Sequence, residues 1–105
     1  MGYRVSVAYG HPTDPKAFDK HYEEVHIPLV RRIPGLVRFT ASHGQSLDGS
    51  APAFYFLAVL DFDSKADLEA GMSSAAGVEA GADVADFATG GATLVAQEIV
   101  DVTSG

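Results

Sequence analysis

The run Phe-Tyr-Phe-Leu-Ala-Val-Leu-Asp-Phe at residues 54–62 constrains the fold most, because it has almost no polar face in an extended conformation. A strand with one face in water alternates apolar and polar side chains, whereas this one is apolar on both parities. We therefore expect a strand with both faces covered. If the helices of a chain of 105 residues lie on one side of its sheet, a second copy of the chain is the economical cover for the other side. The sequence predicts a homodimer.

The elements around this strand follow the order strand, helix, strand, strand, helix, strand. This order matches the split βαβ, ferredoxin-like arrangement, an α+β fold with a four-stranded antiparallel sheet and its helices on one face. We expect one domain over residues 1–105. The predicted strands are residues 3–9, 36–44, 54–62 and 92–102, and the predicted helices are residues 15–32 and a broken second helix over residues 65–88.

Composition excludes several kinds of chemistry. The chain has no cysteine, so disulfides, thiolate zinc sites, iron–sulfur clusters and cysteine nucleophiles are ruled out. Fourteen acidic residues against seven basic ones give a net charge of −7, which opposes binding to nucleic acid. The longest apolar run, residues 51–60, contains a proline and is too short to cross a bilayer. No secretory signal pattern opens the chain, and we expect a cytoplasmic protein with neither a membrane nor a nucleic-acid partner.

The first helix carries two polar residues on its apolar face. Phe18, Tyr22, His26 and Leu29 recur at three- and four-residue steps, so Tyr22 and His26 point inward one turn apart. In a catalytic reading His26 is a general base or hydrogen-bond donor, and Tyr22 orients the substrate or donates to a developing oxyanion. In a structural reading His26 is a core histidine bonded to a backbone carbonyl, and the Tyr22 hydroxyl reaches the surface. Pro28 is expected to kink the helix just after His26.

Other candidate residues are less well defined by the sequence. His43 reaches a pocket rim if its strand parity faces the helices, and the phenylalanines supply an apolar lining or ordinary core. His21 lies about 140° around an α-helix from His26, which places the two on different faces. Asp83 and Asp86 are interpreted as a solvated helix face.

Cofactor motifs are absent from the sequence. It holds no glycine-rich phosphate loop, nucleophile elbow or flavin motif. A mononuclear metal site from His26, His43 and a carboxylate remains an alternative without recognisable ligand spacing. We expect neither a cofactor nor a metal.

Two blocks of the chain resemble a known family. The run His-Tyr-Glu-Glu-Val-His-Ile-Pro-Leu at residues 21–29, followed by Ile-Pro-Gly-Leu at residues 33–36, resembles the signature of the EthD family. These are the ethyl tert-butyl ether degradation proteins of the dimeric α+β barrel superfamily. Residues 73–87 resemble the family's second block, although Ala75 and Ala76 stand where the family often has proline and glutamate. The resemblance implies a homodimer whose two sheets close into a barrel, with a pocket between sheet and helices in each protomer.

The resemblance also implies a range of functions. Superfamily relatives include cofactor-free monooxygenases, muconolactone isomerases and polyketide cyclases, and the namesake is associated with a cytochrome P450 ether-degrading system. We therefore expect a protein that binds a hydrophobic or aromatic small molecule, as a cofactor-independent oxygenase, isomerase or decarboxylase of catabolic or polyketide metabolism. The alternatives are an accessory protein for a partner oxygenase and a stress-related dimer with a vestigial pocket. The expected catalytic residues are His26 and Tyr22, and the expected ligand contacts are His43, Phe18, Phe39, Leu29 and Phe87.

Overall fold

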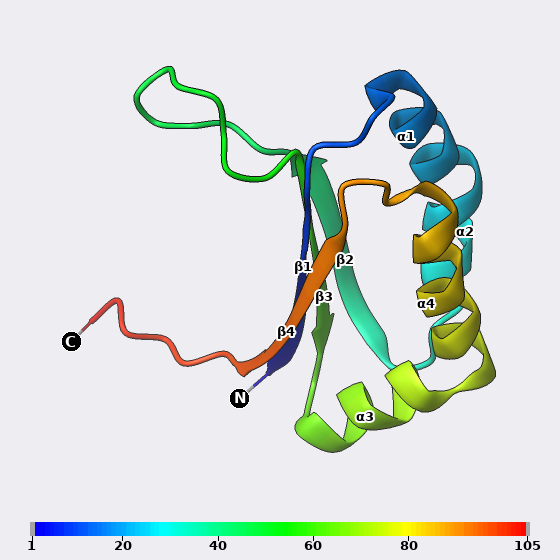
Figure 1. The fold of residues 1–105 in the computed structure, drawn as a ribbon. Coiled ribbons are helices and arrows are strands. Elements are labelled where there is room, and N and C mark those ends of the chain that lie inside the picture. The colour runs from blue at the N-terminus through cyan, green and yellow to red at the C-terminus, as the bar shows by residue number, and fades with distance from the viewer. Residues whose placement is uncertain (1, 105) are drawn as a thin grey trace.

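The computed structural model describes residues 2–104 and has the expected ferredoxin-like architecture, with the helices against one face of a four-stranded sheet (Figure 1). Every pair of neighbouring strands is antiparallel, and the order across the sheet is β2-β3-β1-β4. The elements are β1 (Tyr3–Tyr9), α1 (Pro15–His21), the π-helical turn η1 (Tyr22–His26), α2 (Ile27–Val30), β2 (Leu36–His43), β3 (Phe56–Phe62), α3 (Lys65–Ser73), α4 (Ala75–Phe87) and β4 (Ala92–Glu98). No helix within residues 2–104 is long and apolar enough to span a membrane.

Side-chain caps fix where the helices begin. Asp14 accepts a hydrogen bond from the Ala17 N–H at 3.2 Å, and Ser64 accepts one from the Asp67 N–H at 3.1 Å. The second helical region is broken, as expected, and the break falls at Ser74. The backbone of Ser74 is extended, and its hydroxyl caps the first turn of α4. These local signals could be recognised in the sequence because each cap acts within three residues.

Three strand boundaries differ from the prediction. Strand β4 ends at Glu98 rather than at residue 102, because Glu98 pairs with Tyr3, the first residue of β1, and only one backbone hydrogen bond, from the Ile99 N–H to the Gly2 carbonyl at 2.8 Å, follows it. Strand β3 begins at Phe56 rather than at residue 54, and β2 ends one residue early, at His43. A bulge near Val37 turns that side chain outward, while Phe39 and His43 share the helix-facing register.

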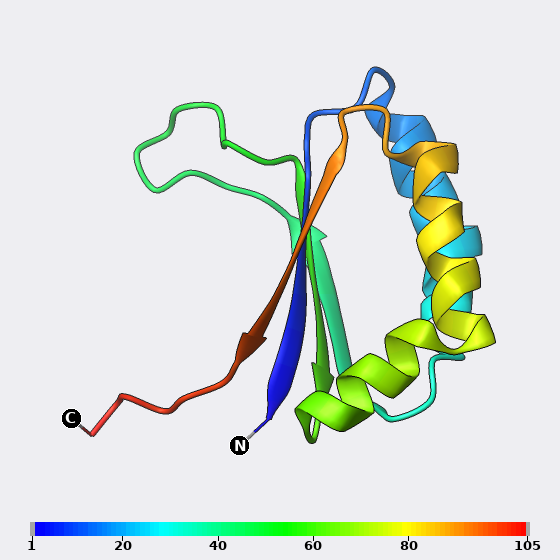
Figure 2. The same cartoon turned by 60° about the horizontal axis from the view of Figure 1, so that its bottom comes forward.

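The two faces of the sheet differ sharply. The helix-facing residues of β1 and β3, such as Val7, Tyr9 and Leu60, are buried in the core. On the other face Leu57 and Val95 are exposed. The single chain therefore covers only one side of β3, and the helices lie on one side while the loop at residues 44–55 and the C-terminal segment extend on the other (Figures 1 and 2).

Candidate functional site

A π-helical turn replaces the expected kink in the first helix. In η1 the Ile27 N–H donates to the Tyr22 carbonyl five residues earlier. Pro28 provides the physical reason, because in a regular α-helix its ring would clash with the Glu24 carbonyl. Widening the preceding turn relieves that clash. Single π-helical turns of this kind occur frequently at functional sites.

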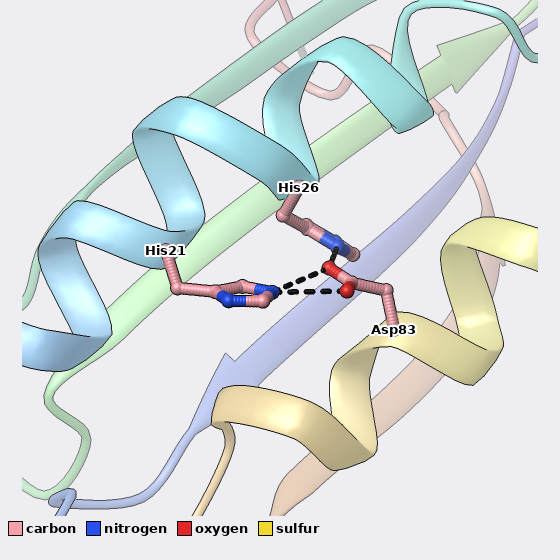
Figure 3. Close-up of polar contacts among 3 residues, drawn as sticks. All are labelled: His21, His26 and Asp83. Atoms are coloured by element: carbon pink, nitrogen blue, oxygen red, sulfur yellow. Dashed lines mark hydrogen bonds and ion pairs between the residues drawn. The ribbon is translucent and has the colours of Figure 1, made fainter.

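The wider turn brings two histidines to one carboxylate. Figure 3 shows His21 and His26 pointing at Asp83 of α4 from the same side of the helix. The His26 Nδ1 lies 3.0 Å from Asp83 Oδ2, and the His21 Nε2 lies 2.9 Å and 3.0 Å from the two oxygens. The prediction that His21 and His26 lie on different faces is wrong, because it assumed the period of an α-helix. The prediction that Asp83 is solvated is also wrong, since it is only 8% exposed.

Asp83 fixes the protonation pattern of the site. An ionised carboxylate only accepts hydrogen bonds, so His26 presents Nδ1–H and His21 presents Nε2–H to it. In a neutral His26 the Nε2 then carries a free lone pair. Burial lowers the pKa of His26 below its ordinary value, against the opposing pull of the Asp83 hydrogen bond and charge. His26, which is 4% exposed, is therefore neutral and available as a base near pH 7.

Tyr22 brings a hydroxyl that has no partner. It is 2% exposed, its ring centre lies 5.0 Å from that of His26, and its Oη makes no hydrogen bond within residues 2–104. Burial raises the pKa of Tyr22, and so does the phenol of Tyr9, which lies nearby without reaching hydrogen-bond geometry. The hydroxyl stays protonated. An unsatisfied buried donor costs about 1–3 kcal/mol, so this group is poised to donate to a ligand.

Tyr22 and His26 both line a recess between the sheet and the helices. The centre of a water-sized molecule can move through about 40 Å³ of it, and the empty space including the open mouth is about 420 Å³. Apart from Tyr9, Tyr22 and His26 the lining is apolar: Val5, Val7, Val30, Ile33, Ala58, Leu60, Met72, Gly77, Ala80, Gly81, Val84 and Leu94. The recess is thus apolar except where these three side chains line it, as small-molecule sites usually are.

The other predicted ligand contacts lie outside this lining. Phe87 packs against the two histidines that bind Asp83. Its ring centre lies 5.1 Å from that of His21 and 4.9 Å from that of His26. Phe18 is core, with its ring parallel to that of Tyr22. The remaining two hydrophobic candidates, Leu29 and Phe39, are partly buried at the edge of the core.

His43 belongs to a separate cluster. Its Nε2 lies 2.9 Å from Asp19 Oδ1, to which Tyr55 also donates at 2.8 Å. Burial and the neighbouring Asp19 raise the pKa of Tyr55 to about 12. His26 and His43 thus bind different carboxylates, and within residues 2–104 no group of three or more His, Cys, Asp or Glu side chains is placed to hold a metal ion.

Asp83 is the residue of the candidate site that sequence reasoning missed, and a signal for it was present. Ala80, Asp83 and Phe87 are spaced three and four apart, so Asp83 stands on the buried stripe of α4. A charged residue on an apolar stripe needs a partner. His21 had no comparable signal, because its inward direction depends on the π-helical turn.

The fold and the recess define a small α+β protein with a pocket on the helix side of its sheet. The EthD domain model matches residues 10–91, so the chain belongs to the EthD family. It is 50% identical over 93 residues to an uncharacterized 11.0 kDa protein in the thcB-thcC intergenic region of Rhodococcus erythropolis, covering 89% of this chain and 90% of that protein. A crystal structure of an EthD family protein from Bacillus halodurans is 32% identical, with a TM-score of 0.88 over 95% of this chain and 100% of that chain.

More distant structures share the fold. A dimeric ferredoxin-like protein from Jannaschia sp. CCS1 is 18% identical, with a TM-score of 0.72 over 94% of this chain and 100% of that one. SnoaB, a cofactor-independent oxygenase from Streptomyces nogalater, is 10% identical, with a TM-score of 0.68 over 99% of this chain and 97% of that one. At these identities the similarity is one of fold alone.

Proposed function

We propose that this protein binds a small hydrophobic or aromatic molecule carrying a phenol or enolisable group, and transfers a proton to or from it in the recess. The unpartnered Tyr22 hydroxyl carries this proposal. A buried donor without a partner among the described residues, beside a neutral imidazole held by a carboxylate, is costly to the fold, and a ligand that accepts a hydrogen bond from it removes that cost.

The chemistry follows from the three side chains. His26 Nε2 takes a proton from the ligand's O–H or acidic C–H, and the positive charge that forms on the ring is balanced by Asp83. The Tyr22 O–H donates to the phenolate or enolate oxygen. His21 holds the second side of Asp83 and keeps it aimed at His26. Removing a proton to form a phenolate or enolate opens the reactions of isomerases and oxygenases that use no cofactor, and in a decarboxylase the same donor would stabilise the enolate left after CO2 departs.

The structural relatives leave two uses for such a site. SnoaB, with the same fold, is a cofactor-independent oxygenase, which supports a catalytic role here. The second use is a binding or accessory protein that holds a hydrophobic molecule for a partner oxygenase, and it needs the same apolar recess and the same donor. Conversion of a bound molecule by the purified protein separates the two.

The binding experiment compares 2-naphthol with naphthalene, which lacks the hydroxyl. Both are titrated into the wild type and into Tyr22→Phe, followed by NMR shifts of backbone amides around the recess. The wild type should bind 2-naphthol, and Tyr22→Phe should lose about 1 kcal/mol, roughly fivefold in affinity, with no change for naphthalene. Equal losses for both molecules, or no loss for either, would contradict a hydrogen bond from Tyr22 to the ligand.

The functional unit in this proposal is a homodimer joined through the face of the sheet that the helices of the chain do not cover. Its support is the exposed apolar surface at Leu57 and Val95 and the dimeric state of the Jannaschia protein. Sedimentation at low micromolar concentration should give a species of about twice the 11.0 kDa chain mass. Leu57→Glu should dissociate it, whereas Val78→Glu, which adds the same charge at an exposed position on α4, should not. A wild-type monomer would refute the dimer.

A further inference from the structure

The exposed members of the lining locate the mouth of the recess. Most residues around it are buried or half-buried, but Gly81 of α4 and Leu94 of β4 are exposed, Leu94 to 52%. Strand β4 is one of the two edge strands and no residue in it is buried. The recess therefore opens between α4 and the helix-facing side of β4. Figure 1 shows α4 on the helix side of the sheet and β4 at the sheet's edge.

The volume limits what fits behind this mouth. One water needs about 10–15 Å³ of such centre-accessible space, so about 40 Å³ holds only a few waters. That is enough for the polar group of a ligand beside Tyr22 and His26 but not for a flat apolar body. The apolar part of a larger ligand must therefore lie at the mouth of the recess. Apolar surface is available there, at Val84 and Leu94.

Gly81 is the residue over which such a body would pass. Glycine is the least favourable helix residue apart from proline, and close packing against a neighbour can offset that cost. Gly77 has one, because a Cβ there would collide with the backbone oxygen of Gly71. Gly81 has none, since a Cβ there would meet no heavy atom within 4 Å. What the missing side chain leaves is open space at the mouth.

We propose that Gly81 sets the size limit of the site: a ligand places its phenol or enol group against Tyr22 and His26, and its apolar body leaves the recess over Gly81 and along Leu94. The inference rests on the proposed function and adds the direction of the ligand and the residue that selects for its length. Gly81 is thus a specificity-determining residue through the absence of a side chain.

The test adds bulk at the mouth and compares a short ligand with a longer one. Phenol and 2-naphthol, which is one ring longer, are titrated by NMR into the wild type, Gly81→Ala, Gly81→Leu and Ala82→Leu. Ala82 is the matched control, because it is exposed on the same helix and does not line the recess. Gly81→Leu should weaken 2-naphthol at least tenfold and phenol less than threefold, and Ala82→Leu should change neither. Gly81→Ala should raise the melting temperature by about 4 °C and weaken 2-naphthol by a smaller factor.

Each result decides the matter. Equal losses of affinity for phenol and 2-naphthol in Gly81→Leu would mean that the new side chain fills the inner cavity. No loss of affinity would mean that the apolar part of the ligand leaves the recess elsewhere. Either result overturns the inference. If Gly81→Leu is poorly folded, the Gly81→Ala comparison is used in the same way. If the wild-type protein binds neither phenol nor 2-naphthol, the inference and the proposed function are both refuted. Sensitivity to Gly81→Leu without sensitivity to Tyr22→Phe refutes only the proposed hydrogen bond.

Discussion

Two carboxylates in this protein each receive hydrogen bonds from two ring side chains, but only one of them is buried. Asp83 lies between His21 and His26 with 8% of its side chain exposed, whereas the side chain of Asp19, bound by His43 and Tyr55, is 43% exposed. The distances in the two clusters are nearly the same, at 2.8–3.0 Å.

The two clusters therefore differ in solvent exposure and not in their hydrogen-bond distances. Around Asp83 and His26 little solvent reaches the side chains, so their hydrogen bond fixes the tautomer of His26 while burial lowers its pKa. Around Asp19 water screens the same contacts, and exposed pairs contribute little to stability. We therefore expect the function to depend on the Asp83 cluster and not on the Asp19 cluster. Matched substitutions in the two clusters test this.

The largest contrast is expected at the carboxylates themselves. Asp83→Asn keeps the shape but turns an amide N–H toward one histidine, leaving a buried group unpaired, and should lower the free energy of unfolding by about 2–3 kcal/mol. Asp19→Asn should cost less than about 1 kcal/mol. Urea unfolding of the two variants measures both. Equal costs would show that burial does not distinguish the clusters.

The tyrosines should respond in opposite directions. Tyr22→Phe removes an unsatisfied buried hydroxyl and should raise the free energy of unfolding by about 1 kcal/mol. Tyr55→Phe removes a hydrogen bond to Asp19 and should lower it by about 0.5 kcal/mol. Thermal unfolding gives the sign in each case. A destabilised Tyr22→Phe protein would mean that its hydroxyl already has a partner.

The pH dependence of stability should also come from the buried cluster. Because the folded pKa of His26 is below its ordinary 6.5, the unfolded chain binds more protons between these two pKa values. The free energy of unfolding should therefore be fully present above about pH 6.5 and fall as the pH drops through that window. In His26→Gln, whose amide can still donate to Asp83, the fall should be smaller. Parallel wild-type and variant curves would exclude His26 as the source.

The smallest effect is expected at His43. His43→Gln should change the free energy of unfolding by less than about 0.5 kcal/mol, because the pair it breaks is exposed. Its affinity for 2-naphthol should stay within twofold of the wild type, since His43 does not line the recess. A large loss of affinity, measured by the same NMR titration, would place His43 in the site after all.

The parts of this molecule that sequence predicts well are those set by local chemistry. Alternation in β1, the run of β3 that is apolar on both parities, and the caps at Asp14 and Ser64 identified the elements, and their order identified the fold. The spacing of Tyr22 and His26 placed both correctly in one recess. Each of these signals acts over a few residues and is therefore visible in a linear string.

The parts that sequence missed depend on contacts between distant elements or on a change of helical period. Asp83 meets His26 across 57 positions, and only the packing of α4 against η1 brings them together. His21 turns inward because Pro28 widens the helix, an effect that the sequence indicated only as a kink. The end of β4 depends on where β1 begins.

Whether Asp83 holds His26 with Nε2 free can be measured without any ligand, by ¹⁵N NMR of the His26 ring at pH 7. We expect a neutral ring with a protonated Nδ1 and an unprotonated Nε2 in the wild type and in Asp19→Asn, and loss of this preference in Asp83→Asn. A wild-type His26 that is doubly protonated, or that carries its proton on Nε2, would show that Asp83 does not hold the ring in this way.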